Sequence, residues 1–235
     1  MRFDIITIFP RIFSSYLNGS MIKRGRAKKL LDIRVHDLRA FTKDKHKKVD
    51  DRPYGGGPGM VLKIEPLVRA LASIKKQVSR NRGKTPVILF SAGGKRFTSK
   101  HAGEWSKKYK HIIMIAGHYE GIDERIKPLI RDTGFLLLEI SIGPYVLTGG
   151  ELPALVVIDA VSRHLPGFLG KEESLEEKRY GVGVPMYTRP EIFLWPPARR
   201  GKKSKKYPTP QILLTGNHKK IEEWRKQRAK KITVY

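Results

Sequence analysis

The chain has 235 residues, which suits one large domain, or a medium domain with a small one. This length allows a hydrophobic core that is stable without disulfides or bound metals. It has no cysteine, which excludes disulfides and thiolate metal sites. Lysine and arginine total 48 against 22 aspartate and glutamate, a formal net charge of +26. Self-repulsion of that size disfavours a compact protein unless a polyanion is nearby. Nucleic acid is therefore the expected partner, and a solvated surface is the alternative.

The N-terminus reads MRFDIITIFPRIF and has neither a long apolar core nor a small-residue cleavage site, so it does not resemble a signal peptide. No segment approaches the roughly 18 to 20 uncharged apolar residues of a membrane span. We therefore expect a soluble cytoplasmic protein without a membrane partner.

The first part of the chain alternates strand-like and helix-like patterns. Residues 3–9 are typical of a strand, 12–30 of a helix with a glycine break, and 31–38 of a strand, because apolar and polar residues alternate there. A long polar loop follows at 42–60, and loops of this length are usually functional or disordered. Residues 63–78 have a helical pattern.

Three short apolar runs follow, at 85–92, 111–116 and 134–142, each bounded by glycine or a polar turn. Such runs, separated by helical patterns, indicate buried parallel strands in an α/β fold. After Pro166 the chain becomes glycine-rich, charged and weakly periodic, which is typical of a linker.

The end of the chain is strongly basic. Residues 198–210 form a basic run that we expect to have no fold of its own, and 214–232 have the pattern of a helix with Asn217 as its N-cap. We predict a larger α/β domain at 1–165, a linker at 166–186 and a small, mainly helical, basic domain at 187–235.

Each of the three apolar strands ends in a glycine-containing loop: LFSAGGKRF, IAGHYEGIDERI and SIGPYVLTGGELP. Ligands of open α/β sheets bind outside the carboxyl ends of the strands, so these loops are expected to form one pocket. None has the lysine or the glycine spacing of a phosphate loop. A pocket of backbone donors and acceptors suits a neutral heterocycle such as adenine, and ordinary strand-to-helix turns are the alternative.

Five motifs in chain order are identifiable: DKHKKVDDRPYGGGPGM, GHYEGIDERI, SIGPYVLTGGELPALVVIDAVSRHLPG, YTRP and LTGNHKKIEEWR. Together they resemble the bacterial tRNA (guanine-37-N(1))-methyltransferase family of the SPOUT superfamily. The resemblance implies a SPOUT-type parallel sheet with a C-terminal trefoil knot in the cofactor loops. It also implies a homodimer with active sites at the subunit interface. The implied reaction transfers methyl from S-adenosylmethionine to N(1) of guanosine 37 in tRNA, beside the anticodon.

The resemblance also assigns residues to the cofactor. Glu120 would attract the positive charge of its sulfonium or amino group, and a surface carboxylate is the alternative. The implied cofactor-binding residues are Leu89, Phe90, Ser91, Gly117, Tyr119, Glu120, Ser141, Ile142, Gly143, Pro144, Tyr145, Val146, Leu147, Gly149, Gly150 and Pro153.

By the resemblance, Arg163 occupies the position of the family's catalytic arginine. It would stabilise the negative charge that develops toward O6 of guanine as N(1) loses its proton, and a phosphate-binding or surface arginine is the alternative. The family's catalytic aspartate is expected in the linker, but an ungapped count places Lys178 there. A gapped alignment brings Glu177 into place, with Glu176 as second choice. The alternative is that both glutamates are solvated linker charges.

The loop at 42–60 carries the expected specificity of the site. Asp50 and Gly59 resemble residues that read the guanine preceding the target. The resemblance also implies magnesium dependence, although no acidic or histidine cluster has clear metal-ligand spacing. The basic insert at 198–208 is unusual for the family and is expected to contact tRNA phosphates.

Two other functions remain open at this point. The chain could be a catalytically impaired tRNA-binding protein that keeps the fold and the cofactor pocket, which Lys178 favours. It could also be a methyltransferase with a changed RNA target, which the intact guanine-reading loop disfavours.

Overall fold

The computed structural model of the chain describes residues 1–77, 85–170, 175, 176, 181, 183–197 and 204–229. The chain divides into two compact units, Met1–Leu169 and Gly170–Tyr235, which are described separately. The predicted residues Glu177 and Lys178 lie outside the described residues, as do 198–203 of the basic insert.

The first unit is built on a five-stranded sheet. Its strands are β1 (Arg2–Thr7), β2 (Asp32–Asp37), β5 (Pro86–Arg96), β6 (His111–Ile115) and β7 (Leu136–Ser141). They lie in the order β2-β1-β6-β5-β7, and every neighbouring pair is parallel. This confirms the predicted α/β class with a parallel sheet. Because all five strands are parallel, their carboxyl ends meet at one edge.

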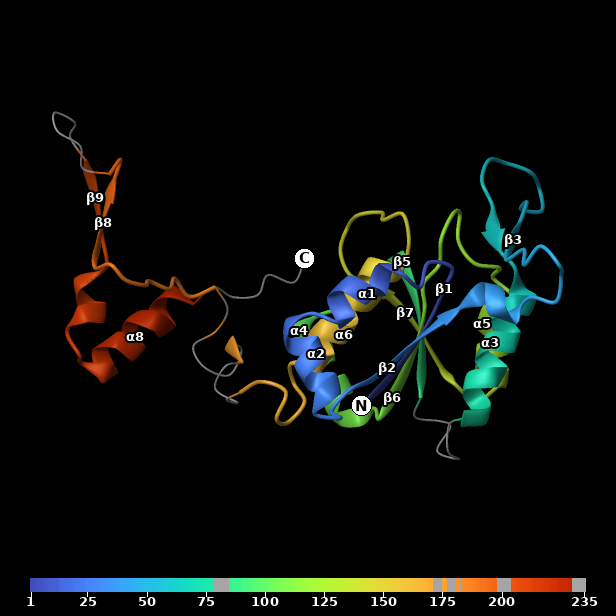
Figure 1. The fold of residues 1–235 in the computed structure, drawn as a ribbon, viewed down its shortest axis with the longest axis horizontal. Helices are drawn as coiled ribbons and strands as arrows, with labels where there is room; N and C mark the ends of the chain where they lie inside the picture. The colour runs from blue at the N-terminus through green and yellow to red at the C-terminus, as the bar shows by residue number, and fades with distance from the viewer. Residues whose placement is uncertain (78–84, 171–174, 177–180, 182, 198–203, 230–235) are drawn as a thin grey trace. The chain divides into compact units, whose positions relative to one another are not determined.

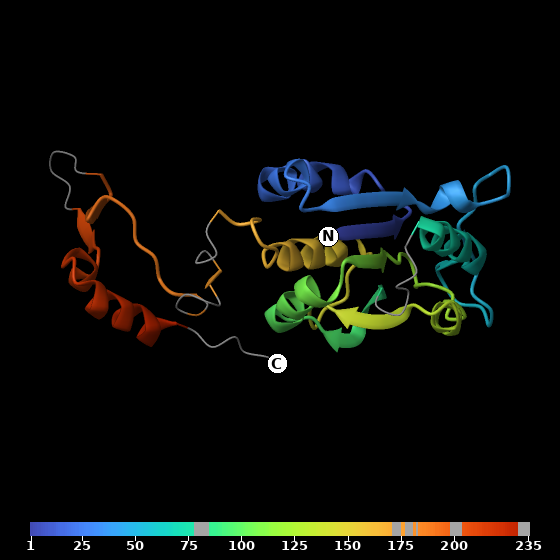
Figure 2. The same ribbon diagram turned by 90° about the horizontal axis from the view of Figure 1, so that it is seen from below.

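Helices cover both faces of the sheet (Figures 1 and 2). One face carries α1 (Ile12–Leu17), α2 (Ser20–Ala27), α4 (Ser99–Lys108) and α6 (Glu151–Ser162). The other face carries α3 (Ile64–Gln77), α5 (Ile126–Asp132) and the 3₁₀ helix η1 (Leu38–Phe41). The predicted helix at 12–30 is divided at Gly19, as its glycine break indicated.

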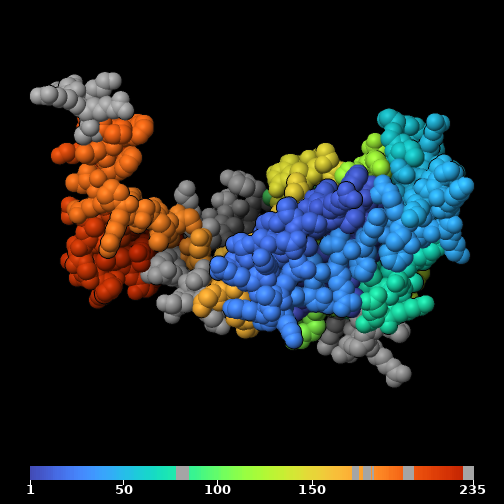
Figure 3. All heavy atoms as spheres, viewed as in Figure 1, coloured from blue at the N-terminus to red at the C-terminus, as the bar shows by residue number. Residues whose placement is uncertain are grey.

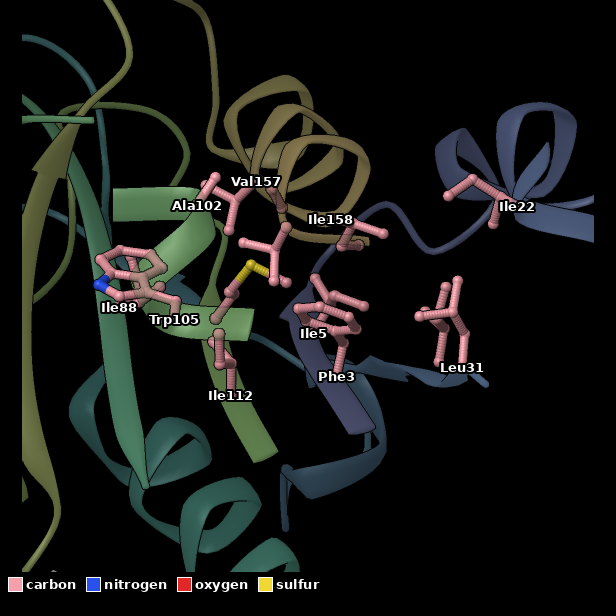
Figure 4. Packing of buried hydrophobic residues seen from close by; sticks show 14 of the residues in the cluster. Phe3, Ile5, Ile22, Leu31, Ile88, Ala102, Trp105, Ile112, Val157 and Ile158 are labelled. Carbon is pink, nitrogen blue, oxygen red and sulfur yellow. The ribbon is translucent and has the colours of Figure 1, made fainter. Parts of the chain in front are cut away.

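Each layer of helices has its own hydrophobic core against the sheet. Figure 4 shows Val157 and Ile158 of α6 facing Ile5 of β1, with Trp105 of α4 beside Ile88 of β5. Every residue of β6 is buried, because this central strand is covered on both faces. That double burial explains why its sequence is apolar from Ile112 to Ile115.

Two features of the first unit were not predicted. The long loop at 42–60 is closed by a short antiparallel pair, β3 (Asp50–Asp51) and β4 (Val61–Leu62). Strand β5 continues beyond its apolar run to Arg96, and Phe90 and Lys95 both pair with Ile140, so residues 91–94 bulge out of the strand.

The second unit contains a two-stranded antiparallel ribbon, β8 (Ile192–Trp195) and β9 (Lys205–Pro208), a 3₁₀ helix η4 (Gln211–Leu214) and helix α8 (His218–Arg228). Within the basic run, Lys205–Pro208 form a strand by pairing with the aromatic strand β8 and not alone. The Asn217 side chain accepts a hydrogen bond from the Lys220 amide, which confirms the predicted N-cap.

No helix within the described ranges is long and apolar enough to cross a membrane.

Candidate active site

A cleft of about 1000 Å³ lies at the edge of the sheet where the strands end. Its walls come from residues 89–92 after the start of β5, 117–127 after β6, and 139–143, 145–150 and 153 at the end of β7. Residues 51–54 and 61–65 complete it. Figure 1 shows the loop between β7 and α6, in yellow, at this end of the sheet, and Figure 3 shows the same loop at the surface beside α1.

The three glycine loops predicted to form one pocket therefore do come together. All of the predicted cofactor-binding residues line the cleft except Pro144. Arg163, Asp50 and Gly59 are not among the lining residues. Ala92, in the first loop, also lines the cleft.

Two of these loops are joined through their backbones. The Gly150 amide donates to the Gly117 carbonyl at 2.8 Å, and Gly149 forms an isolated bridge with His118. A Cβ on Gly150 would lie 2.6 Å from Cα of Ala116, so no side chain fits at this position. Tyr119 adopts a φ of 59°, which is uncommon outside glycine and often marks a functional loop.

The turn after β7 is held by its own side chains. The Ser141 hydroxyl donates to the Gly143 carbonyl at 2.9 Å and accepts from the Gly143 amide at 3.3 Å. The Tyr145 hydroxyl donates to the Ile142 carbonyl at 3.2 Å, which lays its ring against Gly143 where a Cβ would stand. A side chain at residue 143 would therefore displace the Tyr145 ring from this position.

A buried carboxylate lies behind the loops, in the first turn of α6. Glu151 is 3% exposed, and its Oε1 accepts a hydrogen bond of 2.7 Å from the Thr7 hydroxyl. Its Oε2 lies 3.5 Å from Nδ1 of His118. The Thr7 hydroxyl also accepts from the Phe9 amide. Glu151 thus connects the end of β1, the loop after β6 and the start of α6.

The loop between β3 and β4 contacts the loop after β6. The Glu120 amide donates to the Met60 carbonyl at 3.0 Å, and the Leu62 amide donates to the Gly121 carbonyl at 3.0 Å. Gly59 has a φ of +83°, and a Cβ there would collide with the Glu120 carboxylate. The predicted RNA-reading residue Gly59 therefore lies directly against the predicted cofactor residue Glu120, while Asp50 is half-buried on β3.

Charged residues at the start of α5 line the same cleft and were not predicted as site residues. Arg125 pairs with Asp123 at 2.6 Å, and hydrogen bonds from Arg125 hold the pKa of the Asp123 carboxyl below its usual value. Lys127 bridges Glu124 at 2.8 Å and Glu139 at 2.9 Å. The signal that could have indicated them is the charged run directly after the glycine of the second loop.

Within the first unit, the predicted catalytic residue Arg163 lies away from the cleft. Arg163 is the C-cap of α6, whereas the cleft lies at the N-terminus of the same helix. Twelve residues at 1.5 Å each make α6 about 18 Å long. Glu176 is exposed and belongs to the second unit. Across the described part of the chain, no group of three or more acidic or histidine side chains could hold a metal ion.

Comparison with known proteins gives a consistent result. A family model described as tRNA (Guanine-1)-methyltransferase TrmD matches residues 1–235. A protein of Dictyoglomus turgidum named tRNA (guanine-N(1)-)-methyltransferase is 47% identical over 99% of this chain and 86% of its own length. Proteins of the same name from Clostridioides difficile and Anoxybacillus flavithermus are 44% and 47% identical, covering 99% and 97% of this chain and 94% and 86% of their own.

Proposed function

Because the chain belongs to the tRNA (guanine-1)-methyltransferase TrmD family, we propose that it methylates N(1) of guanosine 37 in tRNA, with S-adenosylmethionine as methyl donor. The observation that carries this proposal is the cleft at the strand ends. Residues from three separate loops, selected by their motifs alone, line one cavity there.

The cleft fits such a cofactor. Its volume of about 1000 Å³ is at the upper end of the range of small-molecule sites, roughly 300–1,000 Å³. Gly149 and Gly150 allow a ligand to approach the backbone closely, and backbone N–H and C=O groups suit the edge of adenine. The exposed Glu120 carboxylate would face a positive charge. When bound, the cofactor supplies a methyl group activated by a positive sulfur.

The residues of the chain would then act on guanine. A general base must take the N(1) proton, and Glu177 is our choice, with Glu176 as second choice. Arg163 would stabilise negative charge that develops on O6. Asp50 and Gly59 would read the preceding guanine, where a carboxylate can accept hydrogen bonds from guanine N–H groups.

The position of Arg163 supports a homodimer. Arg163 lies about 15 Å along α6 from Pro153, the cleft-lining residue of this helix, which is far for both to act on one base within a single chain. A second copy that places its own Arg163 beside this cleft resolves the conflict. The active site would then lie at the subunit interface.

An exposed apolar surface beside the cleft supports the same proposal. Ile12 and Tyr16 of α1, and Leu152 and Val156 of α6, are 43–58% exposed. The Tyr16 hydroxyl donates to Asp159 at 2.7 Å, which ties the two helices together. Such a surface is expected to be buried in a complex.

The trefoil knot remains part of the proposal. After the edge strand β7, the chain returns past β5 to pair at Gly149 and Gly150 with the loop after β6, before α6 packs in the core. A crossing of this kind is what a knotted cofactor loop requires. Magnesium dependence and the cytoplasm as place of action follow from the family resemblance alone.

The test is single-turnover methylation of an unmodified leucine or proline tRNA transcript with labelled S-adenosylmethionine. We expect wild type to label guanosine 37, and Arg163→Ala and Glu177→Gln to lose transfer while they still bind tRNA. Glu176→Gln is the matched control from the same segment and should stay active. Collapse of Glu176→Gln instead would move the base to Glu176.

Two outcomes would contradict the mechanism or the function. If both glutamate variants remain active, neither carboxylate takes the proton. If wild type binds tRNA and transfers nothing, the chain is a tRNA-binding protein that keeps the fold. Lys178→Asp would then be expected to create activity.

A further inference from the structure

The β8–β9 ribbon of the second unit places its aromatic residues on one side. In its antiparallel register Phe193 lies opposite Tyr207, and Trp195 lies opposite Lys205. Alternate residues of a strand point to the same side. Phe193, Trp195, Lys205 and Tyr207 therefore form one face, which we call the aromatic face.

The rings of the aromatic face are arranged side by side. Phe193 and Trp195 have centroids 6.4 Å apart and ring planes only 13° from parallel. Phe193 and Tyr207 have centroids 6.5 Å apart, and the Lys205 ammonium lies 5.3 Å from the Tyr207 ring centre. The Phe193 and Tyr207 rings are tilted by 44°, so the three rings form a cluster with two nearly parallel members and a cation over the third.

This face is open to solvent. Phe193, Trp195 and Tyr207 are 51%, 57% and 47% exposed. Cross-strand aromatic pairs stabilise a ribbon, but that role does not need three large rings half in water. Exposed apolar clusters of this kind commonly mark an interaction site.

The charge of the segment indicates what binds there. The sequence from 198 to 206 contains six lysines and arginines and no acidic residue. Exposed aromatic rings close to cations match an unpaired nucleobase, which offers a π-face with phosphates on either side. Double-stranded RNA fits poorly, because its bases are stacked inside the helix and its major groove is too narrow.

We propose that the aromatic face stacks on an unpaired base of the tRNA, while Lys205 contacts a neighbouring phosphate. That the RNA is tRNA is taken from the proposed function. It assigns the ribbon a role distinct from that of the catalytic cleft, namely to increase affinity for tRNA by stacking.

The opposite side of the ribbon supplies a matched control. Ile192 and Leu194 belong to the same strand, point to the other side and are 45% and 38% exposed. Removing them also takes exposed apolar surface from the same strand, without touching the aromatic rings. The double variant Phe193→Ala/Trp195→Ala, the aromatic pair, is therefore compared with the double variant Ile192→Ala/Leu194→Ala, the aliphatic pair.

The dissociation constant for an unmodified tRNA transcript is measured for each variant at fixed salt. Loss of stacking on one base is expected to weaken binding about 5- to 150-fold for the aromatic pair. The aliphatic pair should bind like wild type. Trp195→Phe keeps a stacking ring and should retain most of the affinity.

Lys205→Ala tests the phosphate contact separately. It should make the slope of log K against log salt shallower by about 0.7 to 0.9, whereas the aromatic pair should leave the slope unchanged. A short single-stranded RNA should compete with tRNA for the aromatic face better than an RNA hairpin of equal length. Circular dichroism and cofactor titration confirm that each variant is folded.

Three results would overturn the proposal: equal affinities for the aromatic and aliphatic pairs, better competition by the paired RNA, or a change of mass in sedimentation for the aromatic pair alone. The last would make the face a contact between copies. Failure of the proposed function is distinguishable, because it would appear as absent methyl transfer by wild type. The ratio of dissociation constants is measured without transfer.

Discussion

A buried ionic cluster on β1 leads to a prediction about stability. The Asp4 carboxylate is fully buried and is met by Nε2 of His111 at 2.5 Å, Nε2 of His36 at 2.6 Å and Nε of Arg2 at 2.6 Å. Burial alone would raise the pKa of this carboxyl, but hydrogen bonds from His111, His36 and Arg2 outweigh burial and hold it well below the usual value. Asp4→Asn keeps the shape and removes the charge.

Breaking one partner of a buried ionic group typically costs about 3–5 kcal/mol. For a chain of this size, each kcal/mol lowers the melting temperature by roughly 2–4 °C, so Asp4→Asn should lower it by about 6–20 °C. Differential scanning calorimetry measures the change. Asp32→Asn is the control, because its pair with Arg34 is on the surface and should contribute little.

The sign of the pH dependence follows from the lowered pKa. The stabilisation by Asp4 is complete above the pKa of the unfolded carboxyl, near 3.9, and is lost as the pH falls toward the lower folded value. The gap in melting temperature between wild type and Asp4→Asn should therefore narrow from pH 5 to pH 3. A drop of less than about 2 °C at pH 7, or a gap that stays constant on acidification, would refute the reasoning.

Three further predictions concern the cleft and its surroundings. Gly150→Ala should weaken cofactor binding more than about tenfold in calorimetric titration, because its Cβ would collide with the backbone of Ala116. Gly170→Ala is the control and should bind the cofactor like wild type, because nothing lies within 4 Å of its Cβ. Leu152→Glu should convert a dimer into a monomer in sedimentation and abolish transfer, and a dimeric variant would exclude this surface as the interface. Glu151→Ala should lower the free energy of unfolding by about 1–3 kcal/mol in urea, because Thr7 loses its buried acceptor, and an unchanged midpoint would contradict this.

Much of the sheet could be predicted from local sequence. The strand at 31–38 alternates because β2 is at the sheet edge. The run at 111–116 is apolar after His111 because β6 is buried on both faces. The glycine loops could be placed in one pocket because parallel strands share a carboxyl edge. These are properties of short segments or of general sheet geometry.

Interactions between distant segments could not be predicted in this way. The Asp4 cluster joins residues 4, 36 and 111, which only the strand order brings together. Strand β9 has a basic sequence with no strand pattern, and it forms because β8 offers a partner. The bulge at 91–94 depends on Gly94, whose Cβ would lie 2.7 Å from the Ile140 amide nitrogen of the neighbouring strand.

Helix α6 connects the features of the proposed enzyme. Its start, at Glu151, is tied to the cofactor loops, its inner side packs in the core, and its end carries Arg163. A surface helix normally has one apolar side, but α6 also presents Leu152 and Val156 outward, as expected of a helix that is covered on both sides. In a twofold dimer the same surface of both copies forms the interface, so the residues at one end of the surface contact those at the other end in the second copy. Packing two such helices antiparallel would bring the Arg163 end of one copy to the cleft end of the other, so a single helix can account for both the interface and the completion of the active site.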